Sequence, residues 1–168
     1  MISNIIIIIS LLLDGILTNY LPYMTSDLSL FTPLFTTTSL VLVYPFFYKD
    51  KKKYLITCFV LGFIYDLFYT NLLFISGLVF LLLGLLIAKF YQLFGSGYFK
   101  IIIHILIIIV LYEILNASII MIFNLVPITF SKLIYKISHS ILLNLIYGEI
   151  IYIILRLIPK KYSKINLN

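Results

Sequence analysis

Long apolar segments with almost no charged side chains constrain this 168-residue chain more than any other feature. Apolar residues make up 63% of the sequence and charged residues 11%, whereas soluble domains average about 45–50% and about 25%. So few charges could not shield this much apolar surface from water, and the mean hydropathy of +1.18 agrees. The sequence therefore predicts an integral membrane protein whose side chains are solvated mainly by lipid.

The apolar segments predict an all-α fold, a bundle of six transmembrane helices forming a single membrane domain over residues 1–168. A helix that crosses the bilayer needs about 20 residues. The expected spans are 3–21, 28–48, 54–71, 72–93, 99–125 and 135–158. Only short loops and a tail remain outside these spans, so no soluble catalytic domain is expected.

Local signals refine three of these spans. Pro33 is expected in the first turn of the second helix, where its missing N–H is harmless. Pro45, near the other end, is expected to kink that helix. The connection between the third and fourth spans, near Thr70-Asn71, is very short. These two spans should therefore form an antiparallel hairpin.

Basic residues predict the orientation. If the cluster Lys49–Lys53 and both termini are cytoplasmic, ten Lys and Arg residues lie inside and only two, Lys132 and Lys136, lie outside. This bias favours an even number of spans with N-in, C-in topology. Topology and lipid headgroups also account for the net charge of +6, so no nucleic-acid partner is expected. No positive side chain precedes the first apolar run, so a permanent span is expected there rather than a cleaved signal.

Four carboxyl groups fall inside expected spans, and intramembrane ionisable groups are candidate site residues by default. They are Asp14, Asp66, Glu113 and Glu149. One interpretation is a proton or ion relay. The favoured interpretation is interhelical hydrogen bonding, because no cation lies deep enough to pair with Asp14 or Glu113 and the other two acids lie nearer span ends.

Small and polar residues mark faces where helices can approach closely. Gly62 lies one turn before Asp66, so a second helix could pack against that turn. Gly84 and Ala88 form a small-xxx-small pair that favours close contact, either within the protein or with a partner. Asn144 belongs to a polar stripe with Ser140 and Gly148 that should face the bundle interior.

Catalytic and metal-binding patterns are absent from the sequence, which contains no G-x-S-x-G, H-E-x-x-H or phosphate-binding loop. The lone Cys58 can form neither an intrachain disulfide nor a metal site by itself. His104 lies nine residues before Glu113 and so on the opposite face of a helix. The sequence predicts neither an enzyme nor a cofactor nor a metal site.

Four short motifs in order carry a resemblance to a known family. They are Leu13–Thr18 (LDGILT), Leu30–Phe35 (LFTPLF), Gly62–Leu67 (GFIYDL) and Leu143-Asn144. Together they resemble the rod shape-determining MreD family, in its compact form from low-GC Gram-positive bacteria. The resemblance covers essentially the whole chain, and the Gly-x-x-x-Asp stretch at 62–66 is its most specific part.

The resemblance implies a non-enzymatic subunit of the cell-elongation complex in the bacterial cytoplasmic membrane. Members of this family associate with the single-span protein MreC, and through it with RodA, a class B penicillin-binding protein and MreB. The implied fold is a six-helix bundle similar to the substrate-binding S subunits of energy-coupling-factor transporters. Family-level importance extends to the matching positions Asp14, Pro33, Gly62, Asp66 and Asn144.

A vitamin-binding S subunit is the alternative interpretation, because it would have the same size and number of spans. Such subunits typically carry Ala-x-x-x-Ala on their first span, and residues 3–21 contain no alanine. A vitamin pocket usually also needs Trp or a convergent polar loop, and this chain has no Trp and short loops. Both differences favour the scaffold. The sequence leaves open a homo-oligomer, the partner-contact surface and any lipid or small molecule bound within the bundle.

Overall fold

The computed structural model describes residues 2–20, 32–69, 74–95, 97–123 and 129–157, and every regular element in these ranges is a helix. This confirms the all-α class. In chain order the elements are α1 (Ile2–Tyr20), α3 (Phe35–Val43), the 3-10 helix η1 (Tyr44–Phe47), α4 (Lys51–Tyr69), α5 (Ile75–Phe94), α6 (Tyr98–Ile122) and α7 (Phe130–Leu157).

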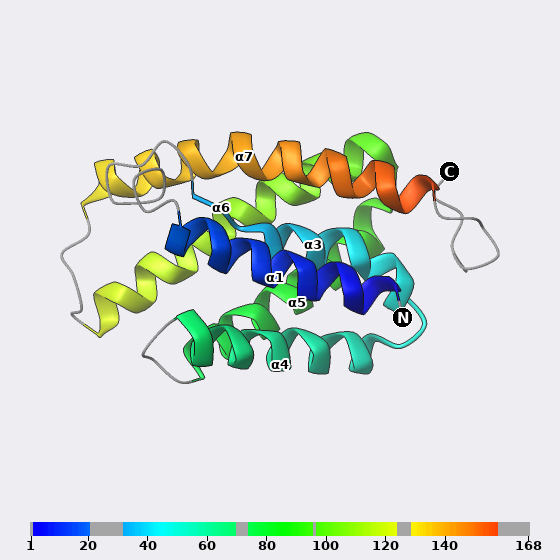
Figure 1. Cartoon of the computed structure of the whole chain (residues 1–168), viewed down its shortest axis with the longest axis horizontal. Coiled ribbons are helices and arrows are strands. Elements are labelled where there is room, and N and C mark those ends of the chain that lie inside the picture. The colour runs from blue at the N-terminus through cyan, green and yellow to red at the C-terminus, as the bar shows by residue number, and fades with distance from the viewer. Residues whose placement is uncertain (1, 21–31, 70–73, 96, 124–128, 158–168) are drawn as a thin grey trace.

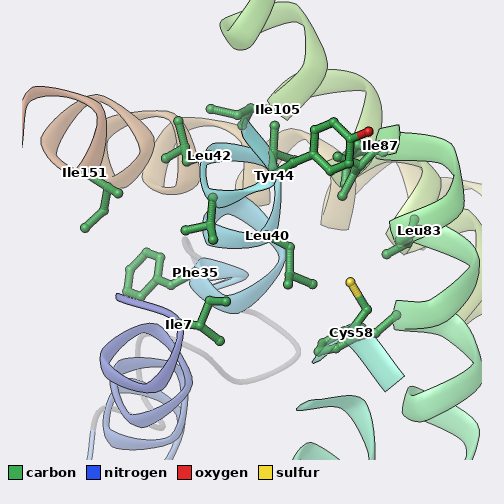
Figure 2. Close-up of a cluster of buried hydrophobic side chains, with 14 of the residues drawn as sticks. Ile7, Phe35, Leu40, Leu42, Tyr44, Cys58, Leu83, Ile87, Ile105 and Ile151 are labelled. Carbon is green, nitrogen blue, oxygen red and sulfur yellow. The ribbon is translucent and has the colours of Figure 1, made fainter. Parts of the chain in front are cut away.

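The short helix α3 lies at the centre of the bundle (Figure 1). Every residue from Phe35 to Val43 is buried, and α3 contacts α1, α5, α6 and α7. Figure 2 shows side chains of the surrounding helices, including Ile7, Leu83 and Ile105, gathered around those of α3. The short hydroxylated and apolar side chains of α3 allow neighbouring helices to enclose it on all sides.

The outer surface of the bundle is apolar as well. Large aliphatic side chains such as Ile8, Leu82 and Ile150 are about half exposed on α1, α5 and α7. By length and composition, α5, α7 and residues Tyr98–Ile119 of α6 could each cross a membrane, while Ile2–Thr18 and Phe35–Phe47 are shorter apolar helices. The described structure is thus that of a membrane protein with lipid-facing helices.

Within the expected second span, 28–48, the structure differs from a helix at residues 32–34. Residues 32–34 are not helical, and α3 begins only at Phe35, so Pro33 precedes the helix instead of lying in its first turn. The cause is steric, because a proline disfavours the α conformation of the residue before it. Near the other end, the backbone changes from α to 3-10 at Tyr44, next to Pro45.

The helical part of this segment is too short to cross the bilayer. Phe35–Phe47 at about 1.5 Å per residue is roughly 20 Å long, against a hydrocarbon thickness of about 30 Å. The N-terminus of α3 therefore lies within the bundle, beside the middle of α1, where no water can satisfy its backbone N–H groups.

The remaining helices differ from the expected spans mainly at their ends. α4 starts at Lys51, inside the lysine cluster, and α7 starts at Phe130, five residues before the expected 135. α4 and α5 pack against one another extensively, as the predicted hairpin requires. The expected boundaries at 21, 28, 71, 72, 125 and 158 lie outside the described residues.

Candidate functional site

Asp14 of α1 binds the N-terminus of α3. The first N–H groups of any helix have no partner within the helix. Here the Phe35 N–H donates to Asp14 Oδ1 at 2.7 Å, and the Thr36 N–H donates to Oδ2 at 2.8 Å. The carboxylate also lies at the positive end of the α3 dipole. Asp14 therefore caps a helix from which it is separated by about twenty residues of sequence.

Asn144 of α7 binds the backbone just before the same terminus. The Leu34 N–H donates to Asn144 Oδ1 at 2.8 Å, and Asn144 Nδ2 donates to Thr32 O at 2.8 Å and to Ser140 O at 2.6 Å. Rotating the amide would place its NH₂ group against the Leu34 N–H, so the hydrogen bonds fix its orientation. As expected from the stripe, both Ser140 and Asn144 are fully buried.

Pro33 occupies the short non-helical stretch between these two contacts. It is buried and brings no N–H group that would need a partner. Non-helical backbone is tolerated at membrane depth only where protein encloses and satisfies it. Asp14, Pro33 and Asn144 thus meet at the non-helical residues 32–34 and the start of α3, here called the α3 junction.

Aromatic contacts between α1, α3 and α7 reinforce the α3 junction. The Ser10 hydroxyl lies 2.6 Å from that of Tyr147, and the Tyr147 ring stacks on Phe35 with centroids 4.1 Å apart. Sequence reasoning missed these residues. Tyr147 directly precedes Gly148 of the polar stripe, but nothing in the sequence pairs it with Ser10.

Tyr69 connects the α4 end of the hairpin to α1 and was also missed. Its hydroxyl donates to Leu11 O at 3.0 Å, and its ring lies where a Cβ at Gly15 would be. Gly15, the glycine of the LDG motif, is therefore required sterically, because a larger side chain would overlap the Tyr69 ring. The position of Gly15 directly after Asp14 was the sequence signal that could have indicated a close contact here.

Gly62 and Asp66 hold the hairpin of α4 and α5 together. The Ser76 N–H at the start of α5 donates to Asp66 Oδ2 at 2.9 Å, and Asp66 is fully buried. A Cβ at Gly62 would overlap Ser76 O and would lie 2.6 Å from Gly77 Cα. The close helix approach expected at Gly62 is therefore present, with α5 as the second helix.

The other predicted residues have different environments. A Cβ at Gly84 would lie 2.8 Å from Cys58 Sγ of α4, and Ala88 is buried, so their stripe contributes to contacts inside the protein. Glu113 is only 2% exposed and makes no hydrogen bond within the described ranges, although Lys136 of α7 is near enough for its charge to act on it.

The chemistry available at the α3 junction is structural. Asp14 and Asp66 each accept hydrogen bonds from backbone N–H groups, as the interhelical interpretation of the carboxyls requires. The described residues contain no group of three His, Cys, Asp or Glu side chains that could hold a metal. His104 lies against the rings of Tyr91 and Phe90.

The fold and the α3 junction define a helical membrane protein in which buried polar side chains hold the N-terminus of a short central helix. A model of the family described as rod shape-determining protein MreD matches residues 1–164. The chain therefore belongs to the MreD family, which makes it a rod shape-determining membrane protein. No curated protein and no solved structure matches the chain.

Proposed function

We propose that this protein is a non-enzymatic subunit of the bacterial cell-elongation complex that binds the membrane span of an MreC-like protein. Through that partner it would influence RodA, a class B penicillin-binding protein and MreB. Family membership supports this role, and so does the use of Asp14, Asp66 and Asn144 to hold backbone rather than to face a substrate.

The proposed topology is six spans in the cytoplasmic membrane with both termini inside. The distribution of basic residues, ten against two, supports it. Reporter fusions after residues 27 and 165 test it, and we expect an extracytoplasmic signal at 27 and a cytoplasmic signal at 165. An extracytoplasmic signal at 165 would contradict the even number of spans.

The partner surface we propose is the exposed apolar surface at the end of α6 and the start of α7. Figure 1 shows these two helix ends well apart. Among the side chains that the structure describes, the buried ones of α7 begin at Ser140 and those of α6 end at Ala117. Beyond them both helices expose large apolar side chains, among them Ile122 at 73% and Phe130 at 76%. An apolar helix of a partner could pack against these exposed side chains.

Glu113 adds a polar group next to this surface. It lies one turn before Ala117 and is only 2% exposed, and Lys136 of α7 is near enough for its charge to act on it. An intramembrane carboxyl is costly unless polar groups or a cation satisfy it. A hydroxyl, amide or basic group on a partner helix would supply further hydrogen-bond donors. Gly62, Asp66 and Gly84, by contrast, are already engaged inside the hairpin.

Site-specific photocrosslinking to co-expressed MreC tests this surface. A crosslinking residue at Ile122 or Ile134 should yield an adduct with the MreC span, because these side chains are exposed on the proposed surface. Leu78 of α5 is the matched control, since it is 55% exposed and Ile134 is 52% exposed. Equal adduct from Leu78, or only adducts between copies of this chain, would contradict the proposed surface.

A further inference from the structure

A groove of about 360 Å³ lies at the opposite end of the α6–α7 pair from the proposed partner surface. Its walls come from the first residue of α6 and the last three turns of α7. The lining residues are Tyr98, Glu149, Tyr152, Ile153, Arg156 and Leu157. The groove therefore combines one carboxylate, one guanidinium, two phenol rings and two aliphatic side chains.

The two charged groups share one face of α7. Glu149 and Arg156 are seven residues apart, which is nearly two full turns and about 10 Å along the helix axis. A helical side chain leans toward the N-terminus of its helix, so the arginine extends toward the glutamate. Neither residue forms a salt bridge within the described ranges, and Arg156 is exposed.

Tyr98 holds the Glu149 carboxylate in position. Its hydroxyl donates to Glu149 Oε1 at 2.8 Å, and its ring lies 5.2 Å from that of Tyr152, centroid to centroid. A half-buried carboxylate held by a single neutral donor retains acceptor capacity for a cationic group. The groove thus presents an acceptor for a cation at one end and a forked donor for an anion at the other.

We propose that this groove binds the phosphoethanolamine headgroup of a membrane lipid. Arg156 would hold the phosphate through its paired N–H donors, which suit phosphate geometry. Glu149 would accept hydrogen bonds from the primary ammonium. The ligand carries both charges a few bonds apart and is neutral overall, so binding satisfies both side chains without leaving a net charge at the membrane. The tyrosine rings and Ile153 line the groove beside the lipid's apolar part.

Native mass spectrometry of the purified full chain tests the assignment with three lipids of identical acyl chains: phosphatidylethanolamine, phosphatidylcholine and phosphatidylglycerol. Phosphatidylethanolamine should bind about tenfold or more tightly than phosphatidylcholine, whose trimethylated nitrogen cannot donate hydrogen bonds to Glu149. Glu149→Gln should remove that preference. Arg156→Gln should weaken the binding of both lipids by a similar factor. Lys136→Gln, at the far end of α7, is the matched control and should leave the binding of both lipids unchanged.

Three results would overturn the proposal. Equal binding of the ethanolamine and choline lipids by the unaltered protein would exclude recognition of the ammonium. Tighter binding of phosphatidylglycerol, unaffected by Glu149→Gln, would assign the groove to an anionic lipid held by Arg156 alone. Soluble O-phosphoethanolamine binding as tightly as the lipid would assign it to a free phosphate ester. The proposal does not depend on MreC binding, so the two can fail separately.

Discussion

Alanine in place of Asp14 should lower the free energy of unfolding by roughly 3–6 kcal/mol, since hydrogen bonds to a charged group contribute about 1.5–3 kcal/mol each. The substitution removes both acceptors of the Phe35 and Thr36 N–H groups. No water can replace them inside the bundle, so two donors would remain buried without partners. Asp14→Asn should cost about half as much, because its amide oxygen can still accept one N–H.

Chemical unfolding in detergent, followed by circular dichroism, measures this loss. Leu12→Ala is the matched control on the same helix, because Leu12 is 54% exposed and faces away from the core. If Asp14→Ala were no more destabilising than Leu12→Ala, Asp14 would not be what holds the α3 junction. Comparing the losses in Asp14→Asn and Asp14→Ala then separates the contribution of the charge from that of the hydrogen bonds.

Gly62 and Gly77, which lie in the α4–α5 interface, should respond differently to alanine. Gly62→Ala places a Cβ into Ser76 O and Gly77 Cα, which are backbone atoms that no side-chain rotation can move. We expect a loss of roughly 3 kcal/mol, at the upper end of the usual overpacking cost. A Cβ at Gly77 would meet Phe59 atoms only at 3.4–3.6 Å, an ordinary contact.

Gly77→Ala should therefore be neutral or should stabilise the protein by up to about 1 kcal/mol, the difference in helix propensity between the residues. Because each variant adds the same methyl group to the same interface, each serves as the control for the other. Thermal unfolding of the two in one detergent provides the measurement. Similar losses in both variants would show that the interface tolerates no added volume and that Gly62 has no special position.

Much of the fold follows from hydrophobic segments alone. Each predicted span contains or overlaps a helix, because segment length and apolar content are local properties of the sequence. The family motifs also indicated the residues of the α3 junction, Asp14, Pro33 and Asn144. Their role was not predictable, because it depends on hydrogen bonds between residues far apart in sequence, 21 positions for Asp14 and Phe35 and 110 positions for Asn144 and Leu34.

The late start of α3 at Phe35 shows where the sequence pattern fails to predict a helix boundary. Leu30–Phe35 and the residues after it are uniformly apolar or hydroxylated, so hydropathy does not distinguish a full helix from a short one. Whether the chain can leave the helical conformation at Pro33 depends on two acceptors supplied by α1 and α7. The Gly84 stripe was ambiguous for a similar reason, because a small-residue face does not specify which helix will cover it.

The hydrogen bonds at the start of α3 have a consequence for biogenesis. The Leu34 N–H and its acceptor on Asn144 are separated by 110 residues, so translation must produce almost the whole chain before this donor is satisfied. Until then, the nascent α3 can be capped only by Asp14. Completion of the bundle is consequently a late, post-insertion event that depends on α7. A ribosome stalled before residue 144 should leave an inserted but incompletely assembled product, a preferred substrate for membrane quality-control proteases.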